Sequence, residues 1–460
     1  MARFIHCGDV HLGNWQYKNE ERYLDFAKAF EVVCKYAVEH EVDFVLVTGD
    51  LFEKKTIDAG TLIQAQDILE PLKSSKLPVI VIEGNHDRRI SSGESFSWLQ
   101  FLNYAGYITL LTHQEDAEGR VILKEWKREG APREGPSGNY IILEDTIIFG
   151  IGYSGSSTSQ LLTNYAEAFK NNQHLFKNRK SILMVHAGLE GYLDKLGGAV
   201  DYNAFLPLKE YINYVALGHI HQTYIRENWI FNPGSLETWN ISEVGRKRGF
   251  FDVVLKDDGV REFNFVEGEK WRRPFYTPEI SLHGINSYPE ALKHIEKELR
   301  KKISDSKKRG EISFAPRLKN GTIPLDAFSH ESKKNTLQED SRRAVVHITL
   351  KGMIGFNPFD FQKSDIEKIV RRLTDPLLVR VKNETYTPTV APTLSLAKGR
   401  DEMEREVIKS LLEETREYKP VAEELASFII ELKTDLLHGA DTEYLVNKLA
   451  KKEKEIKKNS

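Results

Sequence analysis

Residues that bind metals or exchange protons follow one apolar run after another in the first half of the chain. The runs RFIHCGD, FVLVTGD and PVIVIEGNHD alternate with helical patterns, and SILMVHAG and YVALGHIH end in the same way. Continuous Val and Ile runs between helices are typical of strands that are covered on both faces. This pattern predicts a layered α/β domain over residues 1–268.

The side chains that follow these runs are expected to meet in one crevice, because the carboxyl ends of strands in an open α/β sheet share one edge. These residues are Asp9, His11, Asp50, Asn85, His86, His186, His219 and His221. With His86 set aside, two carboxylates, one amide oxygen and four imidazoles make seven potential ligands. Seven ligands are too many for one metal ion, but they suit two ions about 3.5 to 4 Å apart that share a carboxylate.

Each signal alone has an ordinary structural explanation. Asp-x-His is usually a cap or a turn, Gly-Asp often caps a helix, and GNHD could be a polar turn. GHIH places both imidazoles on one face of a strand, where they could form a surface pair. Five signals in order, each after an apolar run, are hard to explain as caps and turns.

The blocks GDVH, VTGDLF, GNHD, VHAG and GHIH resemble the signature of calcineurin-like metallophosphoesterases, whose fold is a four-layer β-sandwich. Within that superfamily, DVHLG, TGDLF, EGNHDR, ALGHIHQ and NPGSLE are most similar to the SbcD-type nucleases of DNA double-strand-break repair, in the meiotic-recombination nuclease family. The resemblance covers about the first 255 residues strongly. It implies a metal-dependent hydrolase, a DNA exonuclease and endonuclease that acts at double-strand breaks.

The resemblance also implies two metal sites that share one carboxylate. The ligands of the first site would be Asp9, His11, Asp50 and His221. The ligands of the second site would be Asp50, Asn85, His186 and His219. Oxygen and nitrogen ligands without thiolate suit manganese, iron or zinc. The resemblance implies two Mn²⁺ per subunit.

The catalytic residues implied by the resemblance are His86 and Asp87. His86 would contact the scissile phosphate or protonate the leaving oxygen without binding a metal. Asp87 would orient His86, although a helix cap is an equally good explanation. One position departs from the family: many members carry His after GDLF, whereas this chain has Glu53. The balance of exonuclease and endonuclease activity therefore stays open.

Basic residues beside the motifs are candidate DNA contacts, and Lys54 and Arg88 are the first choices. Further basic clusters lie at Lys55, at Arg89, in KNRK (177–180), in RKR (246–248) and at Arg272 with Arg273. Such pairs are usually solvated surface. The net charge of −3 means that any surface for nucleic acid is a local patch.

Two helical segments, GTLIQAQDILEPL and ESFSWLQFLNYAG, carry apolar residues at helical spacing. Such stripes are more often simply core. By resemblance, the corresponding helices form a homodimer interface, in which Trp98 and Phe101 would be anchors.

The rest of the chain is expected to contain three segments: a small α+β domain over 269–384, a linker over 385–400, and helices over 401–460. The first of these looks like the capping domain that guides DNA over the site in the resembling family. Residues 304–343 within the cap are polar and predict a mobile loop. Two helices are expected after the linker. One of them carries an apolar stripe suited to docking on a partner or back on the cap: Leu425, Phe428, Ile429, Leu432 and Leu436. By resemblance, the partner is the coiled-coil root of an SbcC-type ATPase.

Composition favours a cytoplasmic protein, associated with the nucleoid if the source is a prokaryote. No apolar run is long enough to span a bilayer, and the N-terminus lacks the features of a signal peptide. Cys7 and Cys34 are too few for a disulfide framework, and both are expected to be buried thiols.

Two rival functions remain open. One is a phosphoesterase for small phosphodiesters or phosphoproteins, which would not explain the cap, the linker and the C-terminal helices. The other is a scaffold that binds DNA ends and holds structural metals. His86 argues against the scaffold, because a scaffold has no need of a non-ligand imidazole there.

Overall fold

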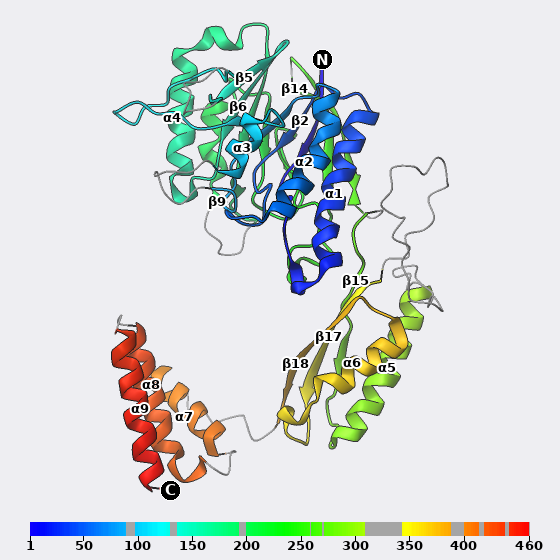
Figure 1. Ribbon diagram of the computed structural model, residues 1–460, viewed down its shortest axis with the longest axis vertical. Helices are drawn as coiled ribbons and strands as arrows, with labels where there is room; N and C mark the ends of the chain where they lie inside the picture. The colour runs from blue at the N-terminus through cyan, green and yellow to red at the C-terminus, as the bar shows by residue number, and fades with distance from the viewer. Residues whose placement is uncertain are drawn as a thin grey trace. The chain divides into compact units, whose positions relative to one another are not determined.

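The chain divides into two units, residues 1–273 and 274–460, in a computed structural model of the protein (Figure 1). The residues that the structure describes are 1–88, 97–128, 136–192, 199–257, 259–268, 271–308, 343–387, 400–413, 418–437 and 441–459. Most of the expected loop over 304–343 and of the linker over 385–400 lies outside these residues, as do Arg89 and the first three residues, 94–96, of ESFSWLQFLNYAG. The boundaries expected within the second unit stay a prediction.

One six-stranded mixed sheet of the first unit has the order β14-β13-β1-β2-β3-β4. β1 to β4 run parallel, β13 is antiparallel to β1, and β14 is antiparallel to β13. The strands are β1 (Ala2–Cys7), β2 (Phe44–Val47), β3 (Val79–Ile82), β4 (Thr109–Leu111), β13 (Gly249–Lys256) and β14 (Gly259–Glu267).

A second six-stranded sheet has the order β11-β12-β10-β7-β6-β5. Its inner strands β12, β10, β7 and β6 run parallel, while the outer strands β11 and β5 are antiparallel to their neighbours. The strands are β5 (Tyr140–Leu143), β6 (Thr146–Ile151), β7 (Lys180–Val185), β10 (Tyr214–Leu217), β11 (Tyr224–Arg226) and β12 (Ile230–Asn232). A short pair, β8 (Gly188–Leu189) and β9 (Ala199–Val200), lies apart from it.

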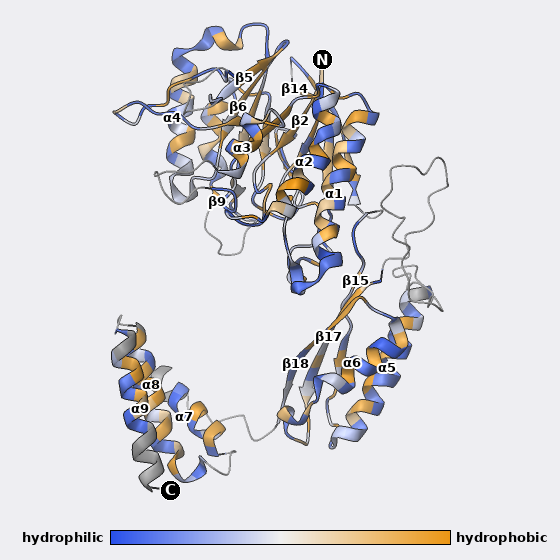
Figure 2. Cartoon of the chain, in the orientation of Figure 1, coloured by the Kyte–Doolittle hydropathy of each residue, from blue (hydrophilic) through white to orange (hydrophobic). Residues whose placement is uncertain are grey.

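The two sheets pack face to face, with helices on their outer faces. Alternate residues of β2 show why: Phe44 and Leu46 lie in the core between the sheets, whereas Val45 and Val47 lie in the core beneath the helices. α1 (Glu20–Glu39), α2 (Ala59–Ser74) and α3 (Trp98–Tyr104) cover the first sheet, and α4 (Thr158–Asn171) covers the second. Figures 1 and 2 show α1 and α4 on opposite sides of the apolar strands. The predicted layered α/β fold is confirmed.

Helix α1 is specified by its cap and its apolar face. The side chain of Asn19 accepts a hydrogen bond from the backbone N–H of Arg22, which satisfies one of the free donors of the first turn. Phe26, Phe30 and Val33 recur at helical spacing and are fully buried. This packing fixes the start of α1 close to the loop that follows β1.

The second unit contains a four-stranded parallel sheet in which β17 pairs with β15, β16 and β18. The strands are β15 (Phe275–Tyr276), β16 (Glu279–Ser281), β17 (Val345–Met353) and β18 (Leu378–Tyr386). α5 (Tyr288–Lys308) and α6 (Lys363–Thr374) contribute to one core with these strands, through residues such as Ile295, Leu299 and Ile366.

Three helices follow in the described part of the C-terminal region, where two were expected: α7 (Arg400–Glu413), α8 (Ala422–Leu437) and α9 (Thr442–Asn459). Ion pairs join α8 to its neighbours, with Lys433 bound to Glu404 of α7 and Lys448 of α9 bound to Asp435. The apolar stripe predicted for this segment lies on α8 and is partly covered by these neighbouring helices. Ile429 and Leu436 stay 38% and 62% exposed, whereas Leu425, Phe428 and Leu432 are half-buried.

Cys7 and Cys34 are both buried free thiols, as predicted. Within the described residues, no helix combines the length and the apolar character that crossing a bilayer requires.

Candidate metal centre

The loops that carry the predicted ligands have an unusual backbone. Asp9, His11, Asp50 and His219 have φ angles of 48°, 55°, 51° and 84°, in the left-handed region. This conformation costs a residue other than glycine about 1–3 kcal/mol and persists only where the surroundings impose it. Backbone hydrogen bonds impose it here, because the N–H groups of Val10 and His11 both donate to the carbonyl oxygen of Asp50. Two ligand loops are thereby tied together.

Glycines let these loops approach one another. A Cβ atom at Gly84 would lie 2.0 Å from Oδ1 of Asp50, and a Cβ atom at Gly49 would lie 2.2 Å from Nδ1 of His186. Both distances are far below van der Waals contact. Glycine is therefore required at these positions for the side chains of Asp50 and His186 to occupy their places.

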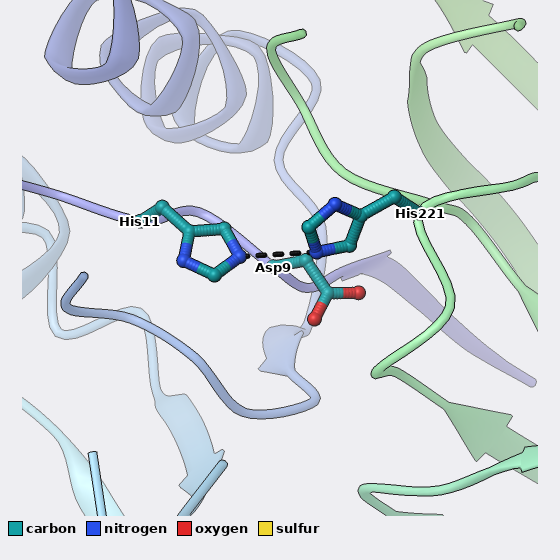
Figure 3. A group of neighbouring side chains, drawn as sticks. All are labelled: Asp9, His11 and His221. Atoms are coloured by element: carbon teal, nitrogen blue, oxygen red, sulfur yellow. Dashed lines mark hydrogen bonds between the residues drawn. The ribbon is translucent and has the colours of Figure 1, made fainter. Parts of the chain in front are cut away.

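Asp9, His11 and His221 form the first group of candidate ligands (Figure 3). The Nε2 atoms of His11 and His221 face each other at 3.1 Å. Nδ1 of His221 donates a hydrogen bond of 2.9 Å to Glu243, so that Nε2 keeps its lone pair for a metal. Arg248, which is completely buried, binds the same carboxylate at 2.9 Å. A carboxylate–imidazole pair thus fixes both the ring and its tautomer.

Asp9, Asp50 and His186 form the second group. Nδ1 of His186 donates to the carbonyl oxygen of Thr48 at 2.7 Å, which directs Nε2 into the group. Asn85 belongs to the same cluster, because its Oδ1 lies 3.1 Å from Nε2 of His186 and 3.0 Å from Nδ1 of His219. All seven predicted ligands are therefore brought together. Asp9 is common to the two groups, and the bridging role expected for Asp50 stays a prediction.

The charges of the cluster fit divalent cations. Asp9, His11, Asp50 and His186 are at most 2% exposed. Burial raises the pKa of Asp50, but the charge of His186 and its hydrogen bond lower the pKa more, so the net shift is downward. Burial lowers the pKa of His186, and the same pairing with Asp50 outweighs it and raises the pKa. Buried carboxylates here are stabilised by neighbouring positive charge, which bound metal ions would supply.

His86 lies beside the first group, with its ring centroid 4.9 Å from that of His11. Its backbone N–H donates to Oδ1 of Asp50 at 2.8 Å, and its Nδ1 donates to the carbonyl oxygen of Glu53 at 2.7 Å. The expected contact with Asp87 is therefore absent from the described hydrogen bonds, and a backbone carbonyl orients the imidazole instead.

Asp87 holds the two loops together. Its carboxylate accepts hydrogen bonds from the N–H groups of Leu51, Phe52 and Gly84, at 3.0, 2.8 and 3.2 Å. Burial and the negative charge of Asp50 raise the pKa of Asp87 to about 7. The support that Asp87 gives His86 is indirect, because it fixes the loop that carries Glu53.

Glu53 and Trp239 were not predicted as site residues, yet both contact the cluster. Oε2 of Glu53 lies 3.0 Å from Nδ1 of His11 and accepts a hydrogen bond of 2.8 Å from Nε1 of Trp239. The Trp239 ring lies 5.8 Å from His11, 6.1 Å from His86 and 5.5 Å from His221, between centroids. Two features of the sequence could have identified them: Glu53 stands where many members of the resembling family have His, and Trp239 follows the NPGSLE motif closely.

The predicted DNA contacts Lys54 and Arg88 are exposed. Nη1 of Arg88 donates to the carbonyl oxygen of Tyr153, whose ring lies 5.4 Å from that of His219, so Arg88 lies at the rim of the cluster. Two other basic residues differ from expectation. Arg248 pairs with Glu243, and Arg273 pairs with Asp25, and both arginines are buried and unable to contact DNA.

The predicted dimer anchors lie on α3. Trp98 packs partly against the core, and Phe101 is 38% exposed. Their ring centroids are 6.4 Å apart. The structure places the two rings side by side, and their role in a dimer stays a prediction.

Comparisons with known proteins find a matching family and several similar proteins. Residues 2–223 match the family model described as calcineurin-like phosphoesterase. The chain is 27% identical to a protein of Archaeoglobus fulgidus over 67% of this chain and 66% of the relative. It is 28% identical to a protein of Methanosarcina mazei, over 63% of this chain and 43% of the relative. It is 23% identical to a protein of Saccharolobus solfataricus, over 98% of each chain. Each is named DNA double-strand break repair protein Mre11. The chain covers less than two thirds of the first two relatives.

Proposed function

We propose that the chain is a metal-dependent DNA nuclease that hydrolyses phosphodiester bonds at double-strand breaks, because residues 2–223 match the family model of the calcineurin-like phosphoesterases. The names of its relatives support DNA as the substrate. The observation that carries the proposal is the convergence of seven oxygen and nitrogen ligands with one further imidazole, His86, at their edge. That set matches the requirements of phosphodiester hydrolysis.

Two Mn²⁺ per subunit are the proposed cofactors, held by the two ligand groups with Asn85 and His219 completing the second. Paired divalent ions lower the pKa of a bound water and stabilise charge on the phosphate oxygens. Protein residues supply the rest. The N–H of His219 donates to both oxygens of Asp9, at 3.1 and 3.0 Å, which keeps that carboxylate turned toward the cluster.

His86 is the proposed general acid. Because Nδ1 donates to the carbonyl oxygen of Glu53, Nε2 is the ring nitrogen left to carry a proton to the leaving oxygen. Arg88 and Lys54, at the exposed rim, bind the DNA backbone and hold the strand in register. Exonuclease and endonuclease cleavage would use the same site.

The proposed working form is a homodimer that acts with an SbcC-type coiled-coil ATPase. Exposure of Phe101 at 38% and of Tyr104 at 67% on α3 supports a surface that a second copy covers. The exposed side chains of Ile429 and Leu436 on α8 support a helix that docks on the ATPase. The half-buried side chains of Leu425, Phe428 and Leu432 on the same stripe would complete that contact.

The test is cleavage of a labelled linear duplex and a single-stranded circle with Mn²⁺ by the full chain. The variants are Asp50→Asn and His86→Ala, with His174→Ala as the matched control, since His174 is exposed and lies on η3 (Gln173–Phe176) away from the ligand loops. Bis(p-nitrophenyl) phosphate serves as a generic small ester.

Loss of DNA cleavage in both site variants, with the control unchanged, is the expected result. His86→Ala should lower kcat by about 10²- to 10⁴-fold, as the loss of a general acid does. If the wild type hydrolyses only the small ester, even with the ATPase added, the DNA nuclease proposal fails and a phosphoesterase for small substrates takes its place.

A further inference from the structure

The turn that follows His11 exposes an aromatic side chain beside the metal centre. Trp15 is 49% exposed, and its ring stacks on that of Tyr23 with centroids 4.7 Å apart and an angle of 27° between the planes. The hydroxyl of Tyr23 contacts the hydroxyl of Thr61 at 3.2 Å, which ties the pair to α2. One face of the indole is therefore supported, and about half of the residue's surface is open.

The residues on both sides of Trp15 are bonded to the site. Nδ2 of Asn14 donates to Oε2 of Glu53 at 3.2 Å. Nε2 of Gln16 donates to the carbonyl oxygens of Trp239 and Thr238, at 2.7 and 3.1 Å. Since Glu53 and Trp239 both contact His11, Trp15 is held at a fixed place next to the first ligand group.

The same turn presents a positive charge. Lys18 is exposed, and its backbone N–H donates to the carbonyl oxygen of Trp15 at 2.8 Å. Tyr17 and Lys18 have φ angles of 60° and 55°, an uncommon conformation that the hydrogen bonds of Gln16 help to hold. Among the described residues, no carboxylate forms an ion pair with Lys18.

A rigid aromatic ring and a lysine beside a phosphodiester-cleaving site match the chemistry of single-stranded nucleic acid. Unpaired bases stack on exposed aromatic side chains, while cations follow the backbone. A base inside a duplex is already stacked on both of its neighbours and cannot offer its face. We propose that residues 14–18 bind the unpaired end of a DNA strand, with a base on Trp15 and a phosphate near Lys18. This inference rests on the proposed nuclease function.

Binding in chelator, where cleavage is prevented, tests this surface. Fluorescence anisotropy gives Kd for a labelled single strand of about 12 nucleotides, within the size range of such sites, and for a blunt duplex of the same sequence. The full-length variants are Trp15→Ala, Trp15→Phe and Lys18→Ala. Lys76→Ala is the matched control, because Lys76 is also exposed and also has a positive φ of 56°, in the turn between α2 and β3. Circular dichroism checks that each variant is folded.

Trp15→Ala should raise Kd for the single strand by about 5- to 150-fold, the range expected for loss of one stacked base. Trp15→Phe should restore most of the affinity, and Kd for the blunt duplex should change little. Lys18→Ala should raise Kd for the single strand and make that Kd less dependent on salt concentration. Lys76→Ala should behave as the wild type. An unchanged Kd for Trp15→Ala, or an equal loss on both DNAs, would overturn the proposal. The proposal would also be overturned if light scattering showed a dimer that depends on Trp15 while Trp15→Ala left DNA binding unchanged.

The two proposals can fail separately. If the wild type cleaves DNA while Trp15→Ala binds single strands normally, the nuclease stands and the surface is wrong. If single-strand binding depends on Trp15 but Mn²⁺ supports no DNA cleavage, the nuclease is wrong and the surface stands.

Discussion

Glu53 touches both the candidate catalytic imidazole and a candidate metal ligand. Its carbonyl oxygen accepts a hydrogen bond of 2.7 Å from Nδ1 of His86, and its carboxylate lies 3.0 Å from Nδ1 of His11. Burial raises the pKa of Glu53, but the contact with His11 lowers it more, so the net shift is downward and the side chain is anionic near neutral pH. The backbone and the side chain of one residue thus act on different groups.

Glu53→Gln should weaken metal binding and leave His86 in place. Glutamine keeps the size of the side chain but removes the charge that strengthens His11 as a ligand. Loss of such an outer contact lowers metal affinity by about 10- to 100-fold. Calorimetric titration of Mn²⁺ measures the effect, with Glu144→Gln on an exposed turn as the control. Because the carbonyl contact to His86 remains, kcat should recover at high Mn²⁺. A fall in kcat that excess metal does not restore would contradict this separation.

Gly84→Ala should displace Asp50. The added methyl group would lie 2.0 Å from Oδ1 and 2.3 Å from the backbone nitrogen of Asp50. Relief of this overlap requires movement of a ligand loop, at a cost of about 1–3 kcal/mol in the free energy of unfolding. Urea denaturation and metal stoichiometry report the two effects. Gly60→Ala is the control: at Gly60 the nearest atom is Oδ1 of Asp58, 3.1 Å away at the end of a side chain. Equal stability of the two variants would argue against the crowding.

Arg248→Met should destabilise the fold and disturb His221. The buried guanidinium binds the carboxylate of Glu243 at 2.9 Å and the carbonyl oxygen of His221 at 2.8 Å. Removing one partner of a buried ion pair costs about 3–5 kcal/mol, because the other charge stays buried. Lys247→Met, at a neighbouring exposed lysine, should change stability by less than about 0.5 kcal/mol. Chemical denaturation distinguishes the two, and similar values for both variants would disprove the role of Arg248.

His6 should make the metal-free fold sensitive to acid. Its ring lies between the sheets, bound to Tyr214 and to the carbonyl oxygen of Leu217, and burial lowers its pKa from 6.5 to about 3. The unfolded chain therefore binds a proton that the folded chain does not, so stability is full above pH 6.5 and falls as the pH drops toward 3. The slope is about 1.4 kcal/mol per pH unit for one proton.

Urea denaturation in chelator between pH 7.5 and 5 measures this effect as the difference in slope between wild type and His6→Gln. Other groups titrate in the same range, and the comparison removes their contribution. Identical slopes would mean that His6 is protonated in the folded chain.

The sequence predicts the ligand set because each ligand follows a buried strand. β1, β2 and β3 run parallel in one sheet, as do β7 and β10 in the other, so residues that directly follow their ends gather at one edge of each sheet. The two edges meet because the sheets pack face to face. Trp239 and Glu243 lie in a loop between β12 and β13 instead. Their contacts with His11 and His221 depend on how distant loops pack, which no local pattern encodes.

Hydrogen bonds to the backbone are also invisible in the sequence. Asp87 is adjacent to His86 in the chain, which suggested a contact between their side chains, yet the carboxylate caps the N–H groups of Leu51 and Phe52. Basic runs mislead for a related reason. Arg273 belongs to a pair of arginines that resembles a surface patch, but its partner Asp25 lies 248 residues away in the sequence.

The left-handed backbone at the ligand positions lowers the stability of the fold, but it places the ligand side chains that the proposed function needs. His219 has a φ of 84°, a conformation that glycine adopts freely and histidine does not. His219→Gly and His219→Ala remove the same imidazole and differ in backbone freedom, so in chelator the glycine variant should be the more stable of the two, by about 1 kcal/mol. A chain selected for stability alone would place glycine there. Retention of histidine at a strained position means that this protein gives up part of its folding free energy to keep a ligand in place.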